Sequence, residues 1–130
     1  MYERVTRNIA VTVEPRFLPE ESRPGDDKFF WAYTVEIANQ GETTVQLKSR
    51  YWNITDGRGH VQEVRGPGVV GEQPIIAPGD VFRYTSGCPL ATPHGVMVGA
   101  YQMVDENGQA FEIDIPAFPL ESPHVRRSVH

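Results

Sequence analysis

The chain has 130 residues, of which 39% are hydrophobic and 22% charged, and this size and composition are typical of one globular domain. Its 12 glycines and 11 prolines amount to roughly one residue in six, which disfavours long helices and favours strands joined by turns. The formal net charge of −5 argues against general nucleic-acid binding, because neutralising phosphates requires a broad basic surface. We therefore expect a single domain over residues 1–130 that does not bind nucleic acid in general.

The single cysteine, Cys88, excludes an internal disulfide framework and suits a reducing compartment. Residues 1–10 contain no apolar segment of the kind found in signal peptides. No stretch approaches the ~20 apolar residues that a membrane-spanning helix needs. These features predict a soluble cytoplasmic protein that does not insert into membranes.

Hydrophobic residues alternate with polar ones along most of the chain, which is the pattern of half-buried strands. In chain order we expect seven to eight antiparallel strands, at residues 9–13, 29–37, 45–54, 60–65, 73–77, 81–86, 96–104 and 111–115. An acidic, proline-rich segment at residues 19–28 is expected to form a mobile loop, and residues 88–95 a second loop. Residues 121–130 are expected to be a frayed tail.

The third predicted strand changes its alternation part of the way along. Val45 and Leu47 are apolar on one face, whereas Trp52 and Ile54 are apolar on the opposite face. A β-bulge or a switch of faces near Tyr51 and Trp52 would explain the change.

Many short strands at close spacing predict an all-β architecture, an immunoglobulin- or fibronectin-III-like β-sandwich. Trp31 and Trp52 are candidates for the core between its two sheets. The cysteine pair that links the sheets of antibody domains is absent from the sequence, so the fibronectin-III-like variant fits better. A closed barrel is the alternative architecture.

A glycine-rich segment between two predicted strands is the most distinctive motif of the sequence. It matches the pattern GxGxxG and consists of Gly66, Pro67, Gly68, Val69, Val70 and Gly71, followed by Glu72. In dinucleotide-binding proteins this pattern leads into a helix whose N-terminus holds the pyrophosphate. Here Glu72 would repel a phosphate, and Pro74 and Pro78 would break the required helix.

The same segment places Val69 and Val70 side by side where an exposed loop is expected. Pro67 stiffens this loop, and an apolar, preorganised loop on a rigid scaffold is suited to binding a partner. An arrangement in which both valines tuck under the edge of a sheet is an equal alternative. Lys48 and Arg50, which share the exposed face of one predicted strand, form a further candidate contact face.

The remaining polar residues predict neither a metal centre nor a catalytic site. His60 with Asp56, and His94 with Cys88, are partial sites that lack the three or four ligands of a zinc site. Cys88 is expected to be a small, partly buried hydrophobic residue. The sequence contains no familiar motif of an activated nucleophile or a nucleotide-hydrolysing loop. We therefore expect no catalytic residue, no metal, no cofactor and no enzymatic activity.

Five segments together resemble the bacterial ApaG family and span most of the chain, at residues 29–39, 47–59, 65–74, 78–103 and 111–120. The resemblance implies a fibronectin-III-like β-sandwich but no settled activity. It also implies a genetic link to cobalt resistance and magnesium efflux, and an operon shared with a diadenosine tetraphosphate hydrolase. Similar domains in an F-box protein and in a polymerase-interacting protein imply a role as an interaction module.

These observations predict a non-enzymatic module that binds an unidentified protein partner through residues 66–72, helped by Lys48 and Arg50. Its link to divalent-cation homeostasis would be indirect. One alternative is a nucleotide- or pyrophosphate-binding protein that uses the glycine-rich loop. Another is a divalent-metal sensor that uses Asp56, His60 or the acidic loop. Open sheet edges would also allow a homodimer.

Overall fold

The regular alternation at Phe29–Asn39 forms β3, the strand on which the first sheet is centred. Its side chains are buried at every second position, as a strand with one face in a core requires. β3 pairs with β2 (Ile9–Phe17) on one side and with β7 (Val81–Leu90) on the other, and β1 (Tyr2–Thr6) pairs with β2. The sheet order is therefore β1–β2–β3–β7, and all its pairs are antiparallel.

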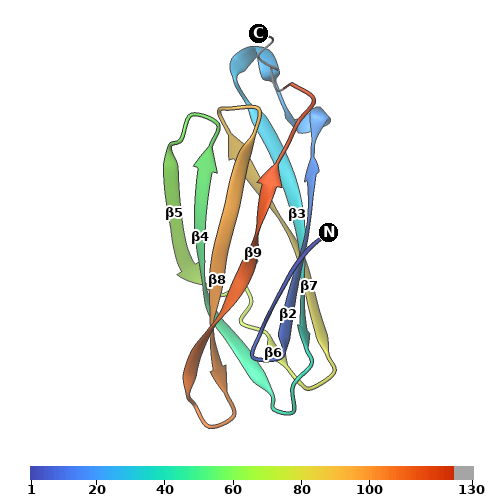
Figure 1. Ribbon diagram of the computed structural model, residues 1–130, viewed down its shortest axis with the longest axis vertical. Coiled ribbons are helices and arrows are strands. Elements are labelled where there is room, and N and C mark those ends of the chain that lie inside the picture. Colours follow the sequence, from blue (N-terminus) through green and yellow to red (C-terminus); the bar gives the residue numbers. More distant parts are fainter. Residues whose placement is uncertain (125–130) are drawn as a thin grey trace.

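The second sheet has five strands and faces the first one to form a sandwich (Figure 1). Its members are β4 (Val45–Asp56), β5 (Val61–Pro67), β6 (Ile75–Ile76), β8 (Gly95–Asp105) and β9 (Ala110–Leu120). The order is β5–β4–β8–β9, and the short β6 pairs with β4 beyond the end of β5. The predicted antiparallel β-sandwich is confirmed, and the alternative of a closed barrel is wrong, because the strands form two separate sheets.

The computed structural model describes residues 1–124. In the segment predicted as an acidic loop it contains two short 3₁₀ turns, η1 (Pro19–Glu21) and η2 (Pro24–Asp26). Backbone hydrogen bonds between Arg23 and Lys28 close this segment, and its mobility stays a prediction. The predicted frayed tail lies outside the described residues from 125 onward. No helix within residues 1–124 has the length and apolar composition needed to cross a membrane.

Several strands differ from their predicted extent: β2 and β9 continue to Phe17 and Leu120, and β6 is shorter than predicted. β1 is absent from the predicted strands, because its residues are almost all exposed and show no alternation of burial. β7 continues to Leu90, so Cys88, Pro89 and Leu90 pair with β3 and do not begin the predicted loop. Pro89 is tolerated there because β7 is an edge strand, where a missing N–H leaves no neighbouring strand unpaired.

A β-bulge causes the change of alternation in β4, as expected, but it lies earlier in the strand than predicted. The register with β8 shifts between Leu47 and Ser49, so that Lys48 is an extra residue in the ladder. Leu47 is buried before the bulge and Trp52 is buried after it. These residues are five positions apart, so in a regular strand they would lie on opposite faces. The predicted bulge is therefore confirmed, whereas its expected location near Tyr51 and Trp52 is wrong.

Aromatic side chains from both sheets meet in the core. Trp31 on β3 and Trp52 on β4 are almost fully buried, as predicted. Tyr33 packs edge-on against Trp52 with ring centroids 5.3 Å apart, and Phe118 of β9 packs against Trp52 at 5.9 Å. Trp31 Nε1 donates a hydrogen bond of 2.8 Å to the carbonyl oxygen of Glu121. This bond ties the chain after β9 to the first sheet.

The central strand β8 has no space for a side chain at Gly99. A Cβ atom there would overlap the carbonyl oxygen of Tyr51 and lie 3.1 Å from the Trp52 ring. We expect Gly99→Ala to lower the free energy of unfolding by about 1–3 kcal/mol, because a close-packed core must shift to accept the methyl group. Chemical denaturation measures the change. Gly25→Ala is the matched control, since nothing lies within 4 Å of a Cβ atom at Gly25. Equal effects of the two substitutions would contradict the packing argument.

Candidate functional site

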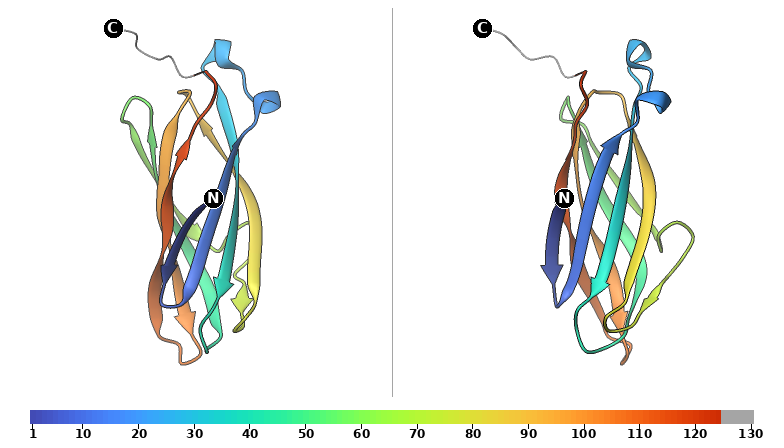
Figure 2. Two further views of the ribbon diagram at one scale, coloured as in Figure 1. Left: turned by 45° about the vertical axis from the view of Figure 1, so that its right-hand side comes forward. Right: turned by 90° about the vertical axis from the view of Figure 1, so that its right-hand side faces the viewer.

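The glycine-rich segment forms a tight turn after β5. Val69 and Glu72 exchange two backbone hydrogen bonds of 2.8 Å, and the residues between them have positive φ, 43° at Val70 and 80° at Gly71. Two successive residues with positive φ are the pattern of a type I′ turn, a rigid connection. We call residues 66–72 the glycine loop. It stands out from the side of the sandwich, as the right-hand view of Figure 2 shows.

Val70 is an unusual residue for its position in this turn. Type I′ turns prefer Asn, Asp and Gly, because a β-branched residue at positive φ is strained by about 1–3 kcal/mol. The Val70 side chain is 55% exposed, so burial does not offset this strain. The neighbouring Val69 is only 1% exposed and belongs to the core. The two valines thus have different surroundings, and only Val70 is available to a partner.

Close packing explains the two other glycines of the loop. A Cβ atom on Gly66 would lie 3.1 Å from the Arg50 guanidinium group, and one on Gly68 would overlap the carbonyl oxygen of Glu72. The loop is followed by β6 and contains no helix, so it lacks the helix N-terminus that holds pyrophosphate in dinucleotide-binding proteins. The GxGxxG pattern therefore reflects packing against Arg50 of β4 at Gly66 and positive φ values at Gly68 and Gly71.

Strand β4 holds the glycine loop with a side chain and with a carbonyl group. Arg50 Nη1 donates to the carbonyl oxygens of Pro67 and Gly68, at 3.0 and 2.9 Å. The carbonyl oxygen of Lys48 accepts hydrogen bonds from the Gly68 backbone N–H at 2.9 Å and from the Gln73 side chain at 2.8 Å. These bonds fix the position of the loop on the strand.

Lys48 and Arg50 do not form the shared exposed face that the sequence predicts. Arg50 pairs with Tyr101 across the β4–β8 ladder, and directly opposed side chains lie on the same face of a sheet. Tyr101 is fully buried, so Arg50 points toward the inside of the sandwich, whereas Lys48 is exposed at the bulge. The bulge is the physical reason for the difference, because it moves every later residue of β4 to the opposite face.

A cavity of about 210 Å³ lies beneath the glycine loop. It is lined by residues of β3, β4, β7 and the loop, namely Tyr33, Arg50, Trp52, Val69, Val70, Gly71, Tyr84 and Ser86. Arg50 supplies the only charge among these described lining residues. Arg50 therefore both fastens the loop and borders the space below it.

Three tyrosine hydroxyls lie in or beside this cavity. The hydroxyls of Tyr84 and Tyr101 are hydrogen-bonded to each other. Burial raises the pKa of Tyr33, Tyr84 and Tyr101 above the ordinary value. Side-chain hydrogen bonds at Tyr33 and Tyr84, and the nearby Arg50 charge, offset this only in part. The hydroxyls therefore stay protonated at neutral pH. Sequence reasoning missed this group, although the spacing of Tyr84 and Ser86 along one strand was an available signal.

A larger hollow, of about 510 Å³, lies on the outer side of the five-stranded sheet. Arg50 borders this hollow as well, and the other polar side chains that line it are already paired within the sheet. Gln102 donates a hydrogen bond of 2.8 Å to Glu112, and the Arg65 guanidinium lies 4.5 Å from the centre of the Tyr51 ring. The smaller cavity beneath the loop is therefore the better candidate for a binding site.

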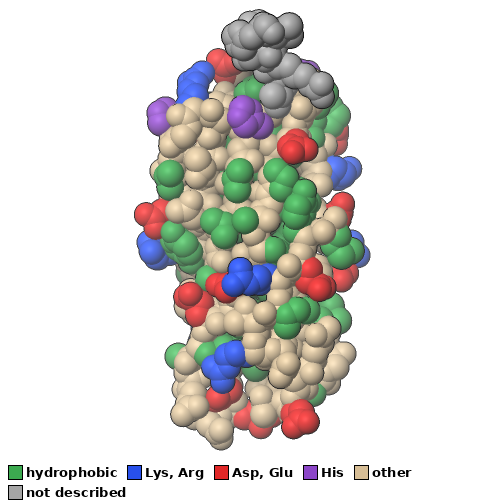
Figure 3. All heavy atoms as spheres, viewed as in Figure 1, with side chains coloured by type: hydrophobic (Ala, Val, Ile, Leu, Met, Phe, Trp, Pro, Cys, Tyr) green, Lys and Arg blue, Asp and Glu red, His purple; other side chains and the backbone are tan. Residues whose placement is uncertain are grey.

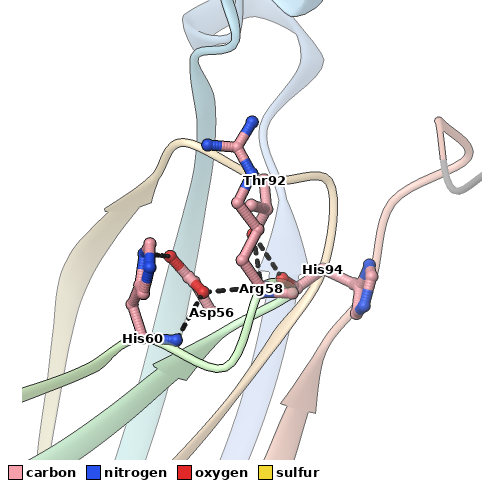
Figure 4. Close-up of polar contacts among 6 residues, drawn as sticks. Asp56, Arg58, His60, Thr92 and His94 are labelled. Atoms are coloured by element: carbon pink, nitrogen blue, oxygen red, sulfur yellow. Dashed lines mark hydrogen bonds and ion pairs between the residues drawn. The ribbon is translucent and has the colours of Figure 1, made fainter.

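The predicted metal-binding pair, Asp56 and His60, shapes a turn (Figure 4). Asp56 Oδ1 accepts backbone hydrogen bonds from Arg58 and His60 at 2.8 and 3.0 Å, and Asp56 Oδ2 lies 3.5 Å from His60 Nδ1. Desolvation raises the pKa of Asp56, but these backbone donors and the charges of His60 and Arg58 together lower it. The Gly57 N–H donates to Thr92 Oγ1 at 2.8 Å, which fastens this turn to the loop before β8.

The other predicted partial site is not assembled either. Cys88 is buried, and burial raises the pKa of its thiol to about 11, so the thiol is protonated at neutral pH. The His94 ring lies against Gly57, where a Cβ atom would be 2.7 Å from His94 Cε1. Within residues 1–124 no three His, Cys, Asp or Glu side chains are grouped so that they could hold a metal ion.

A second apolar surface lies on the outer face of the five-stranded sheet. Val61, Val96 and Val98 are exposed there, and Val61 and Val96 both pair with Thr55 of β4. Figure 3 shows hydrophobic side chains (green) spread over the upper half of the face turned to the viewer. This surface is therefore an alternative to the glycine loop as the place where a partner binds.

The strain at Val70 predicts an unusual response to substitution. Val70→Gly should raise the free energy of unfolding by about 1 kcal/mol, because glycine adopts positive φ without a steric penalty. The matched control is Val61→Gly, the same change at a similarly exposed valine (58%) in a strand. Glycine in a strand is destabilising, so this control should lose about 0.5–1 kcal/mol. Thermal and chemical denaturation of both variants measure the difference, and losses of equal size would show that Val70 is unstrained.

Comparison with known proteins places this fold and loop in a family. The ApaG domain model matches residues 19–105. Protein ApaG from Methylorubrum populi is 62% identical over 130 residues, which cover 100% of both chains, and Protein ApaG from Methylocella silvestris is 63% identical over 127 residues, which cover 98% of both. A crystal structure from Bordetella pertussis, described as an ApaA protein, matches with a TM-score of 0.87 and 53% identity over 90% of this chain and 95% of that one. The chain belongs to the ApaG domain family.

Proposed function

We propose that this chain is a non-enzymatic binding module that contacts a partner protein through the tip of the glycine loop. The observation that carries the proposal is Val70, an exposed β-branched residue at a φ of 43°. Such a residue destabilises the turn by about 1–3 kcal/mol, and asparagine or glycine would serve folding better. Because Val70 does not help the chain to fold, we assign it a role in binding, through a contact between its methyl groups and a partner.

The rigidity of the loop supports the same role. Its turn is closed by the bonds between Val69 and Glu72, and Arg50 and Lys48 hold it on β4. A loop that is already fixed loses little conformational entropy on binding, which improves affinity. An apolar side chain at the tip of such a loop can fill a pocket of the partner, and central buried contacts of this kind dominate the energy of interfaces.

The geometry supports a nucleotide-binding role less well. The cavity of about 210 Å³ is smaller than the roughly 300–1,000 Å³ typical of small-molecule sites. The carbonyl oxygens of Pro67 and Gly68 point toward Arg50 and accept its hydrogen bonds. The loop therefore presents acceptors on this side, whereas a phosphate is bound by N–H donors. Glu72 is exposed beside the tip and does not line the cavity, and it would repel the several negative charges of a nucleotide more strongly than a single carboxylate.

We propose further that the link to cobalt and magnesium implied by the family resemblance passes through the partner. Asp56, the carboxylate nearest a histidine in the predicted metal site, already accepts two backbone hydrogen bonds in its own turn. We also propose a cytoplasmic location, because Cys88 is a free, buried thiol of the kind that suits a reducing compartment.

We keep as a second proposal that the chain forms a homodimer by pairing of its sheet edges. β5 and β7 each end a sheet, and an edge strand has unpaired backbone groups that can bind another strand. In that case the captured partner would be a second copy of the chain, and light scattering would report twice the mass of the monomer.

Val70→Asp should reduce the affinity for the partner by at least about tenfold, because a charge would enter an apolar contact. The substitution should leave the fold intact, since Val70 is exposed. The partner is first identified by cross-linking in cells and mass spectrometry, and its affinity is then measured by calorimetry. Val69 is left unchanged, because a charge at this buried position would disrupt the core.

Val61→Asp is the control for this experiment. It makes the same chemical change at a similarly exposed valine on the outer face of the sheet. We expect this variant to bind the partner like the unmodified chain. Loss of binding with Val61→Asp and not with Val70→Asp would place the contact on the sheet face and overturn the proposal.

A further inference from the structure

Arg50 has hydrogen-bond donors that the glycine loop does not use. A guanidinium group has five N–H donors in a fixed fork, and among described protein atoms only Nη1 of Arg50 donates, to Pro67 and Gly68. No side-chain nitrogen or oxygen within residues 1–124 is buried without a partner, so Nε and Nη2 must reach solvent. Arg50 also takes part in none of the ion pairs among these residues. Its charge therefore lacks a counter-charge where Arg50 borders the cavity beneath the loop and the hollow on the outer side of the sheet.

The neighbouring tyrosine pair adds a directed donor. Tyr101 is fully buried, and within the described chain its hydroxyl has Tyr84 as its one hydrogen-bond partner. Either hydroxyl can donate by geometry, and we take Tyr101 as the donor, because its O–H would otherwise be buried without an acceptor. The hydroxyl hydrogen of Tyr84 is then free to point into the cavity that Tyr84 lines. Tyr33 and Ser86 also line this space, and their hydroxyls interact with each other.

We infer that this cavity binds a carboxylate, presented by an aspartate or glutamate side chain of the partner that contacts Val70. The fork of a guanidinium group matches the two oxygens of a carboxylate, and the Tyr84 hydroxyl is a third donor. The inference rests on the proposed function and adds the chemistry of the partner. Because Val70 forms part of the cavity rim, the recognised segment carries an acidic residue next to an apolar one.

The size and charge of the cavity fit one acidic side chain. Its volume of about 210 Å³ is below the roughly 300–1,000 Å³ of sites for whole small molecules. Arg50 is the one charged group among the described lining residues, so a single carboxylate neutralises the site. The net charge of −5 does not oppose this locally, because exposed charges are screened over about 8 Å at physiological ionic strength.

The test compares two peptides that differ only in the carboxylate, N-acetyl-Val-Glu-Val-amide and N-acetyl-Val-Gln-Val-amide. Each is titrated into the full chain up to about 10 mM while the Nε–Hε signal of Arg50 is followed by NMR. We expect a saturable shift with the glutamate peptide and at least about tenfold weaker binding of the glutamine peptide. Equal binding of both peptides, or no shift of Arg50 with either, would overturn the inference. Inorganic phosphate is the third probe, and tighter binding of phosphate than of the glutamate peptide would also overturn it.

A double variant tests the tyrosine donor without disturbing the hold of Arg50 on the loop. Tyr84→Phe with Tyr101→Phe removes both partners of one buried hydrogen bond, which leaves stability nearly unchanged. We expect the double variant to bind the glutamate peptide about tenfold more weakly. Tyr51→Phe is the matched control, because the Tyr51 hydroxyl bonds to Glu63 outside the cavity, and it should bind normally. Undiminished binding by the double variant would overturn the proposed site.

The peptide titration does not need the natural partner, so the two proposals can fail separately. If Val70→Asp abolishes partner binding but the glutamate peptide leaves Arg50 unchanged, the loop contact stands and the carboxylate site is wrong. If the glutamate peptide binds at Arg50 but Val70→Asp leaves partner binding intact, the carboxylate site stands and the loop contact is wrong.

Discussion

One extra residue in β4, Lys48, determines how the candidate site is built. The bulge that it creates reverses the faces of the strand, so that Trp52 enters the core and Arg50 points to the same side. Without the bulge Arg50 would lie on the outer face, where it could not reach the carbonyl oxygens of Pro67 and Gly68. The fixed position of the glycine loop and the cavity beneath it both follow from this change of register.

Strain and rigidity occur together in the glycine loop. A valine at positive φ persists only where its surroundings over-determine the backbone. Here Val69 anchors one side of the turn in the core, Glu72 closes the turn, and Arg50 holds the residues before it. The sandwich thus stabilises a backbone that Val70 would rarely adopt in a free peptide. The result is an apolar tip in one conformation, above a cavity whose donors are also fixed.

The strands with one buried face could be predicted from the alternation of apolar residues, whereas β1, which is exposed on both faces, could not. The bulge could be predicted but not located. Arg50 faces inward but is polar, so the first apolar residue that reveals the changed register is Trp52. Turn geometry, and not hydropathy, decides which of Val69 and Val70 faces the core. The role of Tyr84 was hidden for a similar reason: a tyrosine at a buried strand position looks like any other core residue until its hydroxyl partner is known.

The close contact between Gly66 and Arg50 has an evolutionary consequence. Any side chain at position 66 would press against the guanidinium group that holds the loop. A shorter residue at position 50 would make room for such a side chain, but the loop would lose its hold on β4. The two positions are therefore expected to change together among related chains.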